Sequence, residues 1–127
     1  MSSQAHTYKA GGTSATAKNH FVKTGTTEQS CLINDTAGGL VIGITEENLV
    51  SGAGAAVVDV DGDITFLEMA EACDEGAEIK SNAAGEGIKV ESNATPENQW
   101  VGFKTLEASS GDGALVRGQK VGYWKYA

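Results

Sequence analysis

The sequence predicts a mainly β protein, with a compact body like a barrel or sandwich, one short helix and an extended N-terminal arm. Three observations lead to this prediction. The 127 residues include 17 glycines and one proline, a composition typical of short strands joined by many turns. Turn signals recur about every 8–12 residues from residue 30 onward, as in all-β barrels and sandwiches. One strand–bend–strand phrase also occurs twice.

The repeated phrase occupies residues 41–58 and 101–116. Each copy begins with an apolar, Gly-containing strand that ends in threonine. The first copy reads Val41-Ile42-Gly43-Ile44-Thr45, and the second reads Val101-Gly102-Phe103-Lys104-Thr105. A bend of small residues and a second apolar strand follow in both. We interpret the copies as two strand–bend–strand units of one β body, with their Gly-rich bends exposed to neighbours.

The arm is expected at residues 1–20, ahead of a single β domain at 21–127. Residues 1–19 are rich in Ser, Thr, Gly, Ala and Gln and have no hydrophobic period. Such a segment cannot bury enough apolar surface to offset its ordering entropy. Residues 1–27 also hold three lysines and two histidines, whereas all 17 acids follow them. A basic arm before an acidic body fits contact with an acidic protein surface.

Strands are expected in the first part of the body at 30–33, 39–45, 55–60 and 63–67. These segments are short, apolar and rich in β-branched residues, and turn residues separate them. Asp61-Gly62 lies between the last two. Both central positions of the favoured hairpin turn need a positive φ, which this dipeptide adopts readily. The sequence therefore predicts a hairpin at this point.

The short helix is expected from Leu67 to Cys73, where Gly76 supplies a left-handed cap beyond its end. The remaining strands follow the same turn-separated pattern. Ala84-Gly85 is expected to join the first two of them as a hairpin. These strands are expected at 78–81, 87–90, 98–106, 114–117 and 120–124.

Motifs for catalysis or metal binding do not emerge, and we expect no enzyme activity, cofactor or metal ion. The acidic run at 59–63 begins like a calcium loop. That loop needs Gly at its sixth position and Glu at its twelfth, where this chain has Ile64 and Ala70, so the acids of the run are expected in water. His6 and His20 have no Cys or His partner at ligand spacing and are interpreted as lone exposed histidines.

Charge, hydropathy and cysteine content indicate which classes of partner and which cellular environment to expect. Lysines and arginines are few and unclustered, so a nucleic-acid partner is not expected. Runs of about 18 apolar residues do not occur, so no membrane contact is expected. Cys31 and Cys73 do not form a CxxC pair and are expected to be reduced and partly buried, as in a protein made in the cytosol. A Cys31–Cys73 disulfide is the alternative.

Two parts of the chain resemble the small head-decoration, or cement, proteins of tailed bacteriophages. The first leads from an Ala-rich stretch into Gly76-Ala77-Glu78-Ile79 and then Gly87-Ile88-Lys89-Val90. The second runs from Val101-Gly102 through Glu107-Ala108 and a Gly turn to a strand ending at Arg117. The resemblance covers about residues 20–124. The long arm and the Trp100/Trp124 pair depart from the family.

The resemblance implies a capsid-decoration function. It implies a β-tulip-like homotrimer, made in the host cytoplasm, that lies on the outer capsid surface of the virion and stabilises contacts between major capsid protein subunits. Its arm would become ordered along the major capsid protein, and three linked arms would gain by effective concentration. The implied capsid-binding residues are Tyr8, Lys9, Lys18, His20, Phe21, Val22 and Lys23.

Aromatic residues near the C-terminus offer a second surface. Alternation along strands places about half of them inward, and we expect Phe103 and Tyr123 there. Trp100, Trp124 and Tyr126 are the candidates for a subunit contact. The alternative function is a receptor- or glycan-binding module that uses these aromatics. A further alternative is a small hydrolase whose site forms between subunits.

Overall fold

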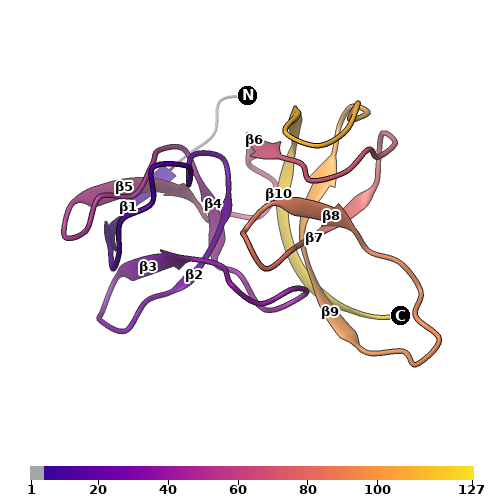
Figure 1. The fold of residues 1–127 in the computed structure, drawn as a ribbon, viewed down its shortest axis with the longest axis horizontal. Coiled ribbons are helices and arrows are strands. Elements are labelled where there is room, and N and C mark those ends of the chain that lie inside the picture. The colour runs from indigo at the N-terminus through magenta and orange to yellow at the C-terminus, as the bar shows by residue number, and fades with distance from the viewer. Residues whose placement is uncertain (1–4) are drawn as a thin grey trace.

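The computed structural model describes residues 5–127 as two β units that lie side by side (Figure 1). The first unit contains β1 (Ala5–Ala10), β2 (Phe21–Thr24), β3 (Ser30–Ile33), β4 (Gly43–Thr45) and β5 (Gly54–Val58). The second contains β6 (Ile64–Glu68), β7 (Glu78–Ser81), β8 (Gly87–Lys89), β9 (Asn98–Thr105) and β10 (Leu115–Tyr126). The prediction of a mainly β fold is confirmed.

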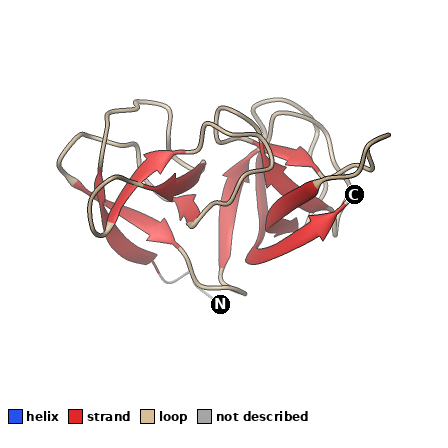
Figure 2. Cartoon of the chain, turned by 90° about the horizontal axis from the view of Figure 1, so that it is seen from below, coloured by secondary structure: helices blue, strands red, loops and turns tan. Residues whose placement is uncertain are grey.

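The short helix predicted from Leu67 to Cys73 is wrong, because residues 5–127 contain strands, turns and loops only (Figure 2). Strand β6 continues to Glu68, and Met69 then makes a parallel bridge to Gly87. Leu67 and Met69 are both fully buried, and their spacing of two residues is the one at which side chains of a strand lie on the same face. No helix in the described part of the chain could cross a membrane.

The first unit is a closed five-stranded barrel with the order β1-β3-β2-β4-β5. Strand β1 closes it, pairing antiparallel with β5 from Ala5–Val58 to Lys9–Gly54 and parallel with β3 at Lys9–Ser30 and Ala10–Cys31. Its buried core contains small and medium side chains. They are Ala10, Ala17, Val22, Cys31, Leu49, Ala55 and Val57.

Residues 1–20 were expected to form an extended arm, but residues 5–20 belong to the barrel of the first unit. Residues 5–10 form β1, whose partners lie on both sides, so the barrel cannot close without them. The Ser, Thr and Gly residues after β1 are held by backbone hydrogen bonds such as Ser14 N–H to Leu49 C=O, at 2.8 Å. The amino-acid composition did not reveal this strand, because β1 contributes to the barrel mainly through backbone hydrogen bonds and buries little apolar side-chain area. Residues 1–4 lie outside the described part.

The second unit repeats the strand connections of the first. Its sheet has the order β6-β10-β9-β7-β8, so that β6, β7, β8, β9 and β10 take the places of β1 to β5. The Met69–Gly87 parallel bridge stands where β1 and β3 pair in the first unit. The repeated phrase is therefore the β4–β5 pair in one unit and the β9–β10 pair in the other. Its two copies mark a duplicated five-stranded fold.

Equivalent threonines make the same side-chain contacts in both units. The Thr45 hydroxyl donates to the Ala17 carbonyl and accepts from the His20 N–H, immediately before β2. The Thr105 hydroxyl donates to the Asp74 carbonyl at 2.8 Å and accepts from the Ala77 N–H at 2.9 Å, immediately before β7. Both threonines are buried. The threonine that ends each copy of the phrase is thus a structural residue that fixes the start of a strand.

Asp61-Gly62 forms a turn, with Gly62 at φ 93°, but the predicted hairpin is wrong. The flanking strands β5 and β6 do not pair with each other, because both sides of β5 are occupied by β1 and β4. The turn instead carries the chain from one unit to the other. The hairpin predicted across Ala84-Gly85 is confirmed by antiparallel pairing of β7 with β8.

The two units share one apolar core. Phe21, Val41 and Ile44 of the first unit pack into the cluster formed by the second. The second unit contributes Leu67, Met69, Cys73, Ile79, Phe103 and Val116. Gly102 permits the close approach, since a Cβ there would lie 2.7 Å from the Phe21 ring. The prediction that Phe103 points inward is confirmed by its complete burial.

Backbone hydrogen bonds also cross between the units. The Phe21 N–H donates to the Gly85 carbonyl at 2.7 Å. Gly38 lies between β7 and β9, where its N–H donates to the Ser81 carbonyl at 2.9 Å and its carbonyl accepts from the Trp100 N–H at 3.0 Å. Buried backbone bonds of this kind fix the relative position of the two units, because leaving any of them unmade carries a desolvation cost.

Placing a charge at Ala10 tests whether β1 belongs to the barrel. Ala10 is 1% exposed and Ala5 is exposed on the same strand. Ala10→Asp should lower the free energy of unfolding by at least about 3 kcal/mol, because it buries an unpaired carboxylate. Ala5→Asp is the matched control and should cost less than about 1 kcal/mol. Urea denaturation measures both, and two equally stable variants would mean that the segment is a free arm.

Truncating Phe21 tests the shared core. Phe21→Ala should cost about 3–5 kcal/mol, since it removes a fully buried aromatic ring from between the units. Phe66, which is 46% exposed on β6, gives the matched control, and Phe66→Ala should cost less than about 1 kcal/mol. Thermal and urea denaturation compare the two. Equal losses would contradict the assignment of Phe21 to the junction.

Candidate functional site

An aromatic face lies on the two-stranded ribbon formed by β9 and the end of β10. Beyond the irregularity between Lys120 and Tyr123, Trp124 pairs with Trp100 and Tyr126 pairs with Asn98. Alternate residues share a side, so Trp100, Trp124 and Tyr126 form one face, which we call the aromatic face. The two indole rings meet edge to face, with centroids 5.1 Å apart and planes at 76°. Trp124 is 53% exposed and Tyr126 is 70% exposed.

Trp100 is the inner residue of the aromatic face. It is half-buried and packs against the shared core. Its indole N–H is the one buried side-chain polar atom in residues 5–127 that has no hydrogen-bond partner. An unmade buried donor costs about 1–3 kcal/mol. The aromatic face therefore consists of two exposed rings, those of Trp124 and Tyr126, beside an inner Trp100 ring that is anchored in the core.

The opposite side of the ribbon is held to β7 by side-chain hydrogen bonds. The Glu78 carboxylate of β7 accepts hydrogen bonds from the Tyr123 hydroxyl and the Lys125 ammonium group. Lys125 and Tyr123 hold the pKa of Glu78 below its usual range. Burial and the Glu78 carboxylate raise the pKa of Tyr123 to about 12. Tyr123 was expected to face the core, but it is 39% exposed, because its hydroxyl reaches a surface carboxylate.

Three of the seven expected capsid-binding residues lie inside the protein. His20 is 5% exposed, and Phe21 and Val22 are fully buried. Their side chains pack at the junction or in the first barrel, because β2 is paired on both sides and lies against the second unit. The prediction that His20 is a lone exposed histidine is therefore wrong. Phe21 and Val22 were expected to lie along a partner, but their side chains are buried and both edges of β2 are already paired, with β3 and β4.

The other four expected capsid-binding residues remain at or near the surface. Lys9 and Lys18 are exposed, and Lys23 pairs with Asp35 at 2.7 Å. Tyr8 donates a hydrogen bond to Asp59 Oδ2 at 2.7 Å.

Asp59, expected in water, is held by β1. His6 Nδ1 lies 2.5 Å from its Oδ1, and Tyr8 binds its other oxygen. Burial alone would raise the Asp59 pKa, but the hydrogen bonds from Tyr8 and His6 outweigh it and keep the pKa below its usual range. Asp61 of the same run accepts a hydrogen bond from Lys120 at 2.7 Å. These carboxylates thus fasten strands together.

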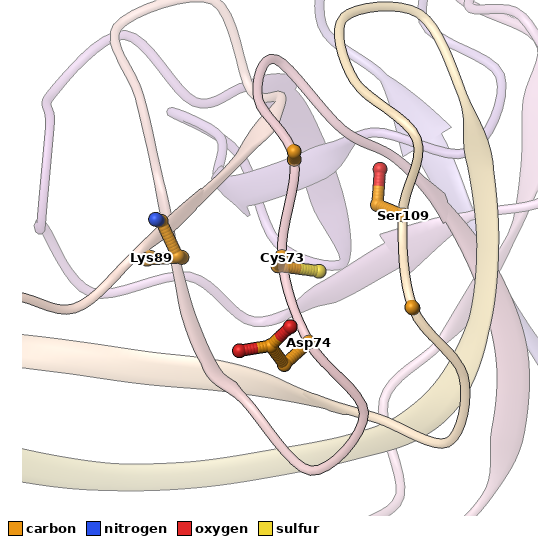
Figure 3. A pocket seen from close by; sticks show the side chains of 6 residues that line it. Cys73, Asp74, Lys89 and Ser109 are labelled. Carbon is orange, nitrogen blue, oxygen red and sulfur yellow. The ribbon is translucent and has the colours of Figure 1, made fainter.

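A hollow of about 280 Å³ opens on the second unit between the 72–74 segment, Lys89 and the 108–109 segment (Figure 3). It contains the residue types of a nucleophilic site, but not their arrangement. Burial raises the pKa of the Cys73 thiol, which favours its unreactive protonated form. Ser109 donates its hydroxyl to backbone carbonyls, and Lys89 lies near Glu71 and Glu91. No base activates a nucleophile among these side chains.

A hollow of about 200 Å³ occupies the corresponding place in the first unit. It is lined by Gly12, Thr13, Ser14, Leu32, Ile33 and Leu49. The Ser14–Leu49 bridge at this hollow corresponds to the Cys73–Ser109 bridge at the other. Both hollows thus follow from the duplicated fold. Cys31 and Cys73 are free and buried, one in each unit, so the disulfide alternative is not adopted.

Comparisons with known proteins identify a solved structure with a similar fold. No protein-family model matches the chain, and no curated protein matches it by sequence. Among solved structures, the head fiber gp8.5 N base of bacteriophage phi29 is similar, with a TM-score of 0.67 at 10% sequence identity. The match covers 93% of each chain. At this identity the similarity shows a shared fold, and it includes both units.

Replacing Glu78 tests the anchor behind the aromatic face. Glu78→Gln should lower the pKa of Tyr123 from about 12 toward 10, because the neighbouring negative charge is removed. The raised pKa means that the wild-type protein has the full stabilisation below pH 10 and loses it as the pH rises toward 12. The variant should show a smaller loss, because the contribution of Glu78 to the raised pKa is removed while that of burial remains.

Tyrosinate absorbance during alkaline titration measures the shift, and denaturation at pH 9 and pH 12 measures the stability change. Glu91→Gln, which removes an exposed acid elsewhere on the second unit, is the control and should leave the titration unchanged. An identical titration in wild type and Glu78→Gln would exclude the Glu78 contact.

Proposed function

We propose that this chain is a structural protein of a bacteriophage head, and that it decorates the outer surface of the capsid by binding the major capsid protein. The observation that carries the proposal is the similarity in fold to the phi29 head fiber base over 93% of both chains. The resemblance of residues 20–124 to head-decoration proteins supports the same role. A protein that ties neighbouring shell subunits together needs contact surfaces and no catalytic pocket.

Capsid attachment is assigned to the exposed basic residues of the first unit. Lys9 lies on β1, and Lys18 lies in the loop before β2. Since β1 is paired on both sides, it has no free edge for an added strand in this state. Contact therefore depends on side-chain charge, which suits an acidic patch on the capsid.

The aromatic face is assigned to self-association as a homotrimer. Trp and Tyr are enriched at the centres of protein interfaces, and large exposed apolar patches mark such surfaces. The Glu78 anchor behind the ribbon keeps the face ordered before contact, which reduces the entropy lost on association. Trimerisation would also place three sets of basic residues on one particle, so that weak capsid contacts add up.

The same aromatic face supports a second function, binding of a glycan or receptor. Exposed Trp124 and Tyr126 rings provide the flat apolar surface on which sugar rings stack. This alternative predicts a monomer whose ligand binding is lost in Trp124→Ala. The sedimentation experiment below separates it from the trimer.

The capsid assignment is tested by co-sedimentation with heads assembled from the major capsid protein encoded in the same genome. Wild type should co-sediment at low ionic strength and progressively less at high salt, because exposed charges are screened. Lys9→Glu/Lys18→Glu should bind at least about tenfold more weakly. Lys104→Glu/Arg117→Glu makes the same charge change on exposed residues of the second unit and should bind normally. Wild-type protein that ignores the heads would overturn the proposed function.

The trimer assignment is tested by sedimentation equilibrium of the free protein. The wild type should have three times the chain mass of 13.1 kDa. Trp124→Ala/Tyr126→Ala should be monomeric at the same concentration, because it removes the two most exposed rings of the aromatic face. Phe66→Ala is the control and should remain trimeric. A monomeric wild type, or a trimeric double variant, would contradict the assignment.

A further inference from the structure

Three side chains of metal-binding type meet at the junction of the two units. His20 comes from the loop before β2 in the first unit, Glu68 from the end of β6, and Glu86 from the turn before β8 in the second. One potential ligand atom of each lies within 4.8 Å of the other two. They form the one such group of three in the described residues.

Hydrogen bonds behind these side chains fix their orientation. His20 Nδ1 lies 2.8 Å from the Lys18 carbonyl oxygen, which can only accept, so Nδ1 carries the proton. Asn82 donates its side-chain N–H to Glu86 Oε1 at 3.2 Å, and its own amide oxygen accepts from the Glu86 N–H at 2.9 Å. Backing of a histidine by a carbonyl and of a carboxylate by an amide is the pattern found behind metal ligands.

The His20 ring presents its other nitrogen to the carboxylates. The His20 side chain is 6% exposed, and its Nε2 lies 3.8 Å from Glu68 Oε2, beyond hydrogen-bond distance. With the proton on Nδ1, Nε2 offers a lone pair toward two groups that also offer lone pairs. Such convergence is unfavourable unless a cation or a proton lies among the three atoms. The buried imidazole, whose Nε2 points at the two carboxylates without a hydrogen-bond donor facing it, is the observation that separates this cluster from an ordinary group of surface acids.

We propose that His20, Glu68 and Glu86 bind one divalent transition-metal ion, with zinc as the best fit, across the junction of the two units. One imidazole nitrogen and two carboxylate oxygens form a borderline ligand set that suits zinc and, more weakly, manganese. Zinc bonds of about 2.0–2.2 Å place tetrahedral ligand atoms about 3.4 Å apart. The side chains therefore move inward by about 1 Å or less on binding. A water molecule completes the tetrahedron.

The ion would act as a clamp between the units. His20 precedes Phe21, whose ring fills the shared core, and Glu68 directly precedes the Met69–Gly87 bridge. Holding the three ligands therefore holds the start of β2 against the end of β6 and the β7–β8 turn. Because the unfolded chain does not assemble this site, binding adds to the stability of the folded protein.

Isothermal titration and thermal denaturation of EDTA-stripped protein with ZnCl2 test the proposal. We expect one zinc ion per chain at micromolar affinity or tighter, and a rise in Tm of about 5 °C or more at a 100-fold excess over the dissociation constant. MnCl2 should bind at least tenfold more weakly. Loading with CoCl2 should give the intense visible absorption typical of tetrahedral Co²⁺. These readouts do not depend on capsid binding.

Matched variants locate the ion. Glu86→Gln and Glu68→Gln should each weaken zinc binding at least tenfold and abolish the rise in Tm, and His20→Gln should do the same. Glu71→Gln and His6→Gln, which remove the same chemical groups elsewhere on the same units, should bind zinc as the wild type does. Glu86 is half-buried in a turn, so its variant remains a folded test if His20→Gln unfolds. Absence of zinc binding, or binding unchanged in Glu86→Gln, would overturn the proposal and leave a shared proton in the cluster.

Discussion

Burial of Phe21 between the barrel of the first unit and the sheet of the second is the contact on which the rest of the structure depends. Its ring occupies the space that Gly102 leaves free, while its backbone N–H and C=O bind Gly85 and Asn34. The next residue, Val22, points into the core of the first barrel. Two successive side chains of β2 thus serve two different cores. A shift of one residue in the register of β2 would exchange them and disrupt both.

The aromatic face follows from this junction. The loop that leads from β3 to β4 inserts Gly38 between β7 and β9 and holds β9 through Trp100. Isolated two-stranded ribbons are only marginally stable in water. The ribbon of β9 and β10 is therefore ordered because one strand is bonded to the first unit and the other side is anchored on Glu78. Contact between the units and presentation of the proposed interface are parts of one arrangement.

Local signals in the sequence predicted β3 to β9 near their observed positions, and long-range relations poorly. Strand β2 was not predicted, and the two strands expected at 114–117 and 120–124 form the single strand β10. Most strand positions and the Ala84-Gly85 hairpin depend on neighbouring residues, which the sequence displays directly. The Asp61-Gly62 turn has the expected local form, but whether its strands pair depends on β1, which lies 50 residues earlier and occupies the edge of β5. The same strand was hidden by its polar composition. The cluster of His20, Glu68 and Glu86 was also missed, since its members lie far apart in sequence and meet only through the junction.

The similarity of the two units has a consequence for how the chain folds. Both halves use the same order of strand pairing, so each strand has a counterpart that could compete for its place, in the manner of domain swapping within one molecule. The closing strands differ enough to limit such exchange. Strand β1 supplies small and polar residues to a closed barrel, whereas β6 supplies Leu67 to a larger core and leaves closure to one bridge beyond its end. The difference in sequence between β1 and β6 therefore disfavours the pairing of a strand of one unit in the place of its counterpart in the other.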